Sequence, residues 1–180
     1  MNTKNNNLSY WESDSFLNYD VIIVGAGITG LSTAISLVEK YNQLSILVLE
    51  KSIFPSGAST KNAGFACFGS LSELLSDIDK LGEESCLNLV KKRWDGLQKL
   101  RTRFSDAELG YIGLGGYELI KPAQPDYLNR MDEVNNLLLP IFNEKVFNEV
   151  SEQIGSFGFN KTVFSKMVFN SFEGQIEVQK

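Results

Sequence analysis

The sequence predicts an α/β fold, in which a strand–helix–strand unit precedes a region of helices and antiparallel strands. Two observations support this prediction. First, Val21 to Val24 is an uninterrupted apolar run, which is typical of a strand buried on both faces of a parallel sheet. Second, Ile28, Leu31 and Ile35 recur at helical spacing, and another apolar run, Ile46 to Leu49, follows them. The order strand, helix, strand is that of a βαβ unit.

A glycine-rich turn, "GAGITG", joins the first predicted strand to the helix. Its spacing is G-x-G-x-x-G, and the second strand ends at Glu50, 20 residues after Gly30. In this pattern Gly25 permits a tight turn, Gly27 lets the backbone approach a pyrophosphate, and Gly30 allows close packing of helix and strand. Amides at the helix N-terminus attract phosphates, and Glu50 would accept hydrogen bonds from a ribose. We therefore predict a Rossmann-like dinucleotide site, rather than a glycine-rich turn without a ligand.

The composition limits the classes of function. A net charge of −5 argues against nucleic acid as a partner, because phosphate-binding surfaces are basic. The absence of histidine excludes Ser-His-Asp and Cys-His hydrolases and argues against a zinc enzyme. Cys67 and Cys86 have neither metal-ligand nor disulfide spacing. The sequence shows no secretory signal and no membrane-spanning run, so we expect a cytoplasmic protein.

The segment after the second strand helps to choose the dinucleotide. An acid at that strand end suits NAD or FAD and disfavours the 2′-phosphate of NADP. An NAD-binding domain would continue with another helix and strand, whereas "SIFPSGASTKNAGFACFGS" has no apolar periodicity. Its small side chains would let amides reach phosphate and ring oxygens of a large planar ligand. The alternative is an Ω-loop without a ligand, although loops of this length usually carry function.

The stretches "VIIVGAGITGLSTA", "VLEK" and "GASTKNAGF" resemble the N-terminal part of the FAD-dependent oxidoreductases of the D-amino acid oxidase and glycine oxidase superfamily. The resemblance runs from Tyr19 to Phe65 and continues more loosely to "FEGQIE". It implies FAD as the cofactor, with Ser59 and Thr60 on the pyrophosphate side and residues 62–65 beside the isoalloxazine. The candidate cofactor-binding residues are Gly25, Gly27, Ile28, Thr29, Gly30, Glu50, Lys51, Ser59, Thr60, Lys61, Asn62, Ala63, Gly64 and Phe65. No catalytic residue and no metal ligand is assigned.

The rest of the chain predicts helices and short strands. We expect amphipathic helices over Leu71–Leu81 and Leu87–Phe104, a hairpin around Gly113–Gly116, and a helix that begins at Pro125. A further helical stretch is expected from Glu144 to Gly155, followed by a strand within "KTVFSKMVFNSF". The expected domains are a mobile extension (1–18), an FAD-binding βαβ unit with its flavin loop (19–70), and an incomplete substrate domain (71–180).

The resemblance implies a flavin-dependent oxidoreductase that oxidises the C–N bond of an amine or amino acid by hydride transfer to flavin. Members of that superfamily are considerably longer, so we expect a truncated reading frame, a fragment, or one part of a split protein. Two alternatives stay open: a catalytically silent nucleotide-binding fragment and, less favoured by the loop, an NAD-dependent dehydrogenase. The expected partner is a small amine or amino acid; its identity, the electron acceptor and the oligomeric state do not follow from the sequence.

Overall fold

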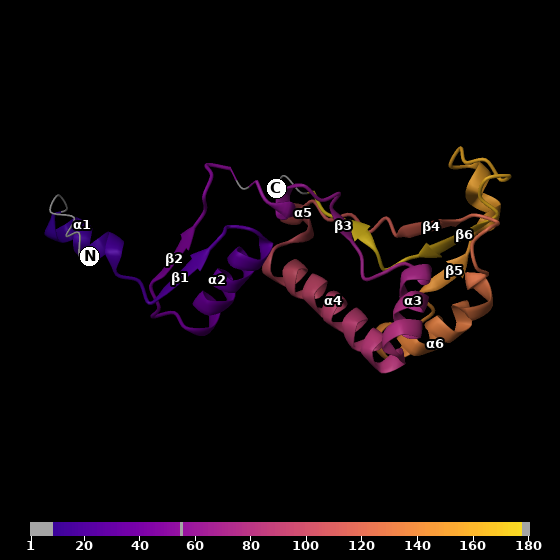
Figure 1. Cartoon of the computed structure of the whole chain (residues 1–180), viewed down its shortest axis with the longest axis horizontal. Helices are drawn as coiled ribbons and strands as arrows, with labels where there is room; N and C mark the ends of the chain where they lie inside the picture. Colours follow the sequence, from indigo (N-terminus) through magenta and orange to yellow (C-terminus); the bar gives the residue numbers. More distant parts are fainter. Residues whose placement is uncertain (1–8, 55, 178–180) are drawn as a thin grey trace. The chain divides into compact units, whose positions relative to one another are not determined.

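The computed structural model describes residues 9–54 and 56–177, and the chain divides into two compact units after Asn62 (Figure 1). Each unit has its own secondary structure. The elements of the first unit are α1 (Tyr10–Leu17), β1 (Val21–Val24), α2 (Ile28–Lys40), β2 (Ile46–Leu49) and the 3₁₀ turn η1 (Ala58–Thr60).

The first unit contains the predicted strand–helix–strand motif. Strands β1 and β2 pair in parallel, with Val21 opposite Ile46 and Val24 opposite Leu49, and α2 contacts both strands. The pairing continues past the strand ends, because the Gly25 amide donates to the Leu49 carbonyl at 2.7 Å. The α/β fold and the bounds of both strands are therefore confirmed.

The predicted burial of β1 on both faces is wrong. Val24 is 85% exposed, and none of the residues of α2 is buried. The physical reason is that one helix covers only part of a two-stranded sheet, and in the described part of the chain β1 and β2 pair only with each other.

The N-terminal segment forms a helix over its described residues. Helix α1 begins with a capping box, in which Ser9 accepts from the Glu12 amide while the Glu12 side chain accepts from the Ser9 amide. The side chains of Tyr10, Trp11 and Phe16 in this segment are all largely exposed. The predicted mobile extension covers residues 1–18, and residues 1–8 of it lie outside the described residues.

The second unit combines helices with short antiparallel strands. A three-stranded sheet has the order β4-β6-β5, and β3 pairs with β7. Its helices and 3₁₀ turns are α3 (Leu71–Leu81), α4 (Glu83–Arg103), α5 (Asp106–Leu109), η2 (Tyr127–Arg130), α6 (Met131–Phe142) and η3 (Ser151–Gly155). Its strands are β3 (Phe65–Ala66), β4 (Gly116–Ile120), β5 (Phe147–Glu149), β6 (Lys166–Asn170) and β7 (Gly174–Gln175).

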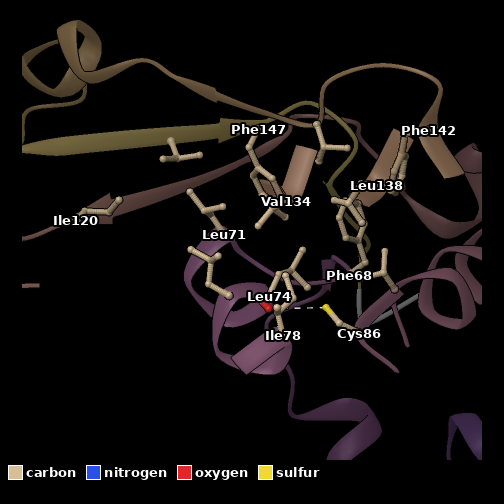
Figure 2. Packing of buried hydrophobic residues seen from close by; sticks show 14 residues of the cluster. Phe68, Leu71, Leu74, Ile78, Cys86, Ile120, Val134, Leu138, Phe142 and Phe147 are labelled. Carbon is tan, nitrogen blue, oxygen red and sulfur yellow. Dashed lines mark hydrogen bonds between the residues drawn. The ribbon is translucent and has the colours of Figure 1, made fainter. Parts of the chain in front are cut away.

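The hydrophobic core of the second unit lies between α3, α4, α6 and the three-stranded sheet (Figure 2). Leu71, Leu74, Leu75 and Ile78 of α3 are buried in it, as their helical spacing predicts, whereas Leu81 at the end of the helix is 57% exposed. Cys86 of α4 belongs to this core, and its thiol donates to the Leu74 carbonyl at 3.7 Å. The buried cluster consists of Phe68, Leu71, Leu74, Leu75, Ile78, Cys86, Val90, Ile120, Val134, Leu138, Phe142, Val146, Phe147 and Val168.

One buried amide fixes α6 to β5. Asn135 is 1% exposed, and its Oδ1 accepts from the amides of Val146 at 3.0 Å and Phe147 at 2.8 Å. Its Nδ2 donates to the Phe147 carbonyl at 2.9 Å. A buried polar side chain is stable only when its hydrogen bonds are made, and here the backbone at the start of β5 supplies them.

Two predicted elements of the second unit are wrong. The expected hairpin around Gly113–Gly116 is absent from the described residues: β4 pairs with β6, and Ile112 only bridges Gln175. The expected helix from Glu144 to Gly155 is instead β5 followed by η3. In both places a strand pairs with β6, a distant partner that local sequence patterns do not reveal.

Candidate functional site

The glycine turn has the geometry that its spacing predicts. Gly25 has a φ of +104°, a conformation that L side chains rarely adopt. A Cβ at Gly30 would collide with the Gly25 carbonyl, so only glycine lets the first turn of α2 pack against the end of β1. The amides of Thr29 and Gly30 in that first turn have no acceptor among the described residues. They remain available for an anionic ligand.

Two side chains from later in the chain reach this turn. Glu50, just after β2, accepts from the Ala26 amide through Oε2 at 2.9 Å. Ser59, in η1, accepts from the Ile28 amide through Oγ at 3.0 Å. A Cβ at Gly27 would lie 3.0 Å from the same Oγ, which shows how closely Ser59 approaches the glycine backbone. The structure thus brings Glu50 and Ser59 to backbone amides that lie 24 and 31 positions earlier in the sequence.

The remaining candidates of the first unit surround η1. The Thr60 hydroxyl donates to the Gly57 carbonyl at 3.3 Å, and Asn62 Nδ2 donates to the Ser59 carbonyl at 2.7 Å. These bonds close the turn that holds Ser59 in position. Lys51 and Lys61 are exposed.

Ala63, Gly64 and Phe65 belong to the second unit. Gly64 is buried with a φ of +75°, and its carbonyl accepts from the Ile176 amide at 2.7 Å. Phe65 opposite Gln175 forms the β3–β7 pair, and its ring is 78% exposed. The predicted flavin-bordering segment is therefore an ordered strand start with an accessible aromatic ring.

The residues around the glycine turn fit a bound dinucleotide. A pyrophosphate needs free amides, and those of Thr29 and Gly30 have no acceptor among the described residues. A ribose needs an acceptor beyond the second strand, and Glu50 Oε1 has no partner among the described residues. The carboxylate is held in place by its other oxygen, which the Ala26 amide binds.

A second candidate feature is a cavity of about 650 Å³ within the second unit. Its walls include Phe65, Cys67 and Glu173, and none of its lining residues is a lysine or arginine. Burial raises the pKa of Glu173 to about 7, and the nearby Glu73 carboxylate acts in the same direction. Burial also raises the pKa of the Cys67 thiol, with Glu173 and Glu73 adding to the effect, so this cysteine is a poor nucleophile.

Sequence reasoning missed Glu173. The only signal was an acid directly before a glycine inside the apolar stretch "VFNSFEGQIEV". Acids in that position are common in exposed turns, and the burial of this one depends on strands that meet only in the folded unit.

The fold and the glycine turn define a dinucleotide-binding protein of the α/β class. The model of the family described as "FAD dependent oxidoreductase" (DAO) matches residues 20–141. The chain therefore belongs to this family, whose members are FAD-dependent oxidoreductases. The match spans the glycine turn, Glu50 and the loop that carries Ser59.

Solved structures share the fold at low sequence identity. The glycine oxidases of Geobacillus kaustophilus and Bacillus cereus match with 18% and 19% identity and TM-scores of 0.52 and 0.53. Iminodiacetate oxidase from Chelativorans sp. BNC1 matches with 19% identity and a TM-score of 0.59. Each match covers 88% of this chain but only 40% to 41% of the other chain. The chain thus spans about two fifths of the length of these proteins.

Two further results complete the comparisons. No curated protein matches the sequence significantly. Within the described residues, none of the helices has the length and apolar character needed to cross a bilayer.

Proposed function

We propose that this chain is the FAD-binding part of an oxidoreductase that oxidises the C–N bond of an amine or amino acid. One observation carries the proposal: Glu50 and Ser59 both reach the glycine turn at the start of α2. Family membership supplies the flavin. The names of the similar structures, glycine oxidase and iminodiacetate oxidase, support an amine or amino acid as the substrate class.

The proposed roles follow from the chemistry of each group. The Thr29 and Gly30 amides would bind the pyrophosphate, where the partial positive charge of the helix N-terminus also acts. Glu50 would accept hydrogen bonds from the ribose hydroxyls. Gly27 would keep the backbone close to the phosphates, and residues 62–65 would border the isoalloxazine.

In this proposal the chain binds and orients, and the cofactor supplies the redox chemistry. The residues around the glycine turn would hold FAD, which would supply a hydride acceptor for the carbon next to the substrate nitrogen. The nitrogen must be a neutral amine when the hydride leaves, because its lone pair stabilises the developing positive charge. The ammonium form of the substrate must therefore lose one proton, to water or to a protein group, before the hydride leaves.

A second candidate is a nucleotide-binding module without turnover. The exposure of β1 favours it for this chain alone. The two candidates share the FAD site and differ only in whether substrate electrons reach the flavin.

The test uses the 180-residue chain after incubation with FAD and removal of the excess. Anaerobic addition of glycine, sarcosine or benzylamine should bleach the visible flavin band if the chain oxidises C–N bonds. A retained flavin that no amine bleaches would support the silent module. Binding of NAD with no retention of FAD would contradict both candidates.

Replacement of Glu50 tests the cofactor site itself. Glu50→Gln removes the charged acceptor, which strengthens a hydrogen bond by about 1.5 to 3 kcal/mol, and should weaken FAD binding at least about tenfold. The control is Glu144→Gln, which removes a carboxylate from an exposed position of the second unit. Equal FAD affinity in the wild type and Glu50→Gln, measured by fluorescence titration, would show that Glu50 does not hold the ribose.

A further inference from the structure

The cavity of the second unit combines aromatic rings with carboxylates. Phe65, Tyr117 and Phe157 contribute rings to its wall, and Glu73 and Glu173 contribute the only carboxyl groups among its lining residues. The Tyr117 and Phe157 rings lie with centroids 4.9 Å apart. Ring faces and carboxylates both attract organic cations, and the wall holds no cationic side chain to repel them.

Glu173 is held in the wall of this cavity by the backbone around it. A Cβ at Gly116 would collide with Glu173 Oε2, so the glycine at the start of β4 makes room for the carboxyl group. The amides of Phe68 and Gly69 donate toward the carboxylate and favour its ionised form. The carboxyl is therefore fixed between β4 and the segment that follows β3.

One oxygen of Glu173 lacks a partner. Oε1 is inaccessible to solvent and makes no hydrogen bond in the described part of the chain. The Asn170 amide is close enough to favour the ionised form, yet its Nδ2 also makes no hydrogen bond of good geometry. Asn170 itself is buried, with Oδ1 bound to the Phe172 amide at 3.0 Å. Buried polar atoms without a hydrogen-bond partner are rare in folded proteins.

The position of Glu173 connects it to the predicted flavin-bordering segment. Glu173 directly precedes β7, which pairs with β3 through Phe65 opposite Gln175. The Ile176 amide donates to the Gly64 carbonyl at 2.7 Å. The cavity, the carboxyl and the segment 63–65 therefore belong to one small antiparallel structure.

We propose that Glu173 binds the ammonium group of the substrate in this cavity and takes one of its protons, an assignment that rests on the proposed function. In this step an N–H bond of the ammonium breaks and an O–H bond forms at the carboxyl, which leaves a neutral amine and a neutral acid. Nothing is oxidised or reduced in the step. The proton passes to solvent when the carboxyl ionises again.

The electrostatic surroundings suit a proton acceptor near neutral pH. Burial raises the pKa of Glu173 to about 7, so the carboxyl is partly ionised under physiological conditions, and bound ammonium would favour the ionised form. The chain has no histidine to perform this task. The titratable or charged groups nearest to the carboxyl are Glu73, the Cys67 thiol, Tyr117, Glu118, and Arg93, whose guanidinium donates to the Phe68 carbonyl.

The test measures binding of benzylammonium to the full chain, with and without FAD, by isothermal titration calorimetry. The expected result is binding that is at least about tenfold tighter than that of benzyl alcohol, the neutral ligand of similar shape, because a charged hydrogen bond is lost with the alcohol. Glu173→Gln should weaken benzylammonium binding by a similar factor, and Glu144→Gln should leave it unchanged. Equal binding to the wild type and Glu173→Gln would overturn the assignment.

A measurement on the unmodified chain avoids any effect of the variant on folding. The side-chain carboxyl carbon of Glu173, observed by NMR, should titrate near pH 7, and benzylammonium should lower that midpoint. A midpoint that benzylammonium does not move would overturn the assignment.

The presence or absence of FAD separates this inference from the proposed function. If the chain retains FAD and Glu173→Gln does not change benzylammonium binding, the role of Glu173 would be overturned and the FAD site would stand. If ammonium binding depends on Glu173 but the chain never retains FAD, the proposed function would be overturned. The role of Glu173 as a proton acceptor in oxidation would then be overturned as well, and only the ammonium site would stand.

Discussion

The carboxyl of Glu173 links the stability of the second unit to pH. Its pKa is raised from 4.5 to about 7 in the folded chain, so below pH 4.5 it is protonated whether folded or unfolded. Between pH 4.5 and 7 the unfolded chain loses this proton first, and the free energy of unfolding falls as pH rises. Above pH 7 the full cost of the ionised buried group is present.

We therefore expect Glu173→Gln to be more stable than the wild type at pH 8 by about 2 kcal/mol, a figure reduced for partial solvation. At pH 4 the two chains should have similar stability. Urea unfolding followed by tryptophan fluorescence in a Trp11→Phe background, which leaves Trp94 packed against Phe68 and Phe142, measures both values. A difference that does not change with pH would show that Glu173 has an ordinary pKa.

Asn135 is the residue whose loss should affect the second unit most clearly. Asn135→Ala leaves the buried amides of Val146 and Phe147 without acceptors, and we expect a loss of about 2 to 3 kcal/mol in the free energy of unfolding. The matched control is Asn136→Ala, at the exposed neighbouring position of α6, which should change stability by less than about 0.5 kcal/mol. Similar urea midpoints for the two variants would contradict this role.

At the scale of elements, the start of α3 is stabilised by a capping box. Ser70 Oγ accepts from the Glu73 amide at 3.4 Å, and Glu73 Oε2 accepts from the Ser70 amide at 3.1 Å. Ser70→Ala should reduce the stability of the second unit by about 1 kcal/mol. Ser9→Ala removes the corresponding cap of α1 and should leave the unfolding monitored at Trp94 unchanged, because α1 belongs to the first unit. An equal effect of both changes would contradict this account.

The elements that the sequence predicts correctly are those whose signals are local. The apolar runs of β1 and β2 and the helical stripe of α3 each lie within a dozen residues, so periodicity alone identifies them. The glycine turn and Glu50 are also predictable, because the spacing of one βαβ unit fixes their relation.

The elements that the sequence misses depend on distant partners. Strand β4 pairs with β6, about 50 residues later, so the glycines at 113–116 looked like the turn of a local hairpin. Strand β5 pairs with the same β6, which overrides the helical pattern after Glu144. The burial of Glu173 could not be predicted for the same reason, because β3, β4 and β7 create it together.

At the scale of the whole molecule, the two units differ in how well they bury apolar surface. The second unit has a dense core, whereas the first leaves Ile22, Val24 and Leu49 of its two strands exposed. Large exposed apolar surface on a short parallel sheet favours association. A chain that binds FAD through the first unit gains stability from the ligand, since binding to the folded state alone shifts the folding equilibrium.

The central claim is that β1, the glycine turn, α2 and Glu50 hold FAD. The most direct measurement is the visible absorption spectrum of the folded 180-residue chain after addition of FAD and removal of the excess. We expect a retained and shifted flavin band that Glu50→Gln weakens and Glu144→Gln does not. A folded chain that retains no flavin would contradict the claim.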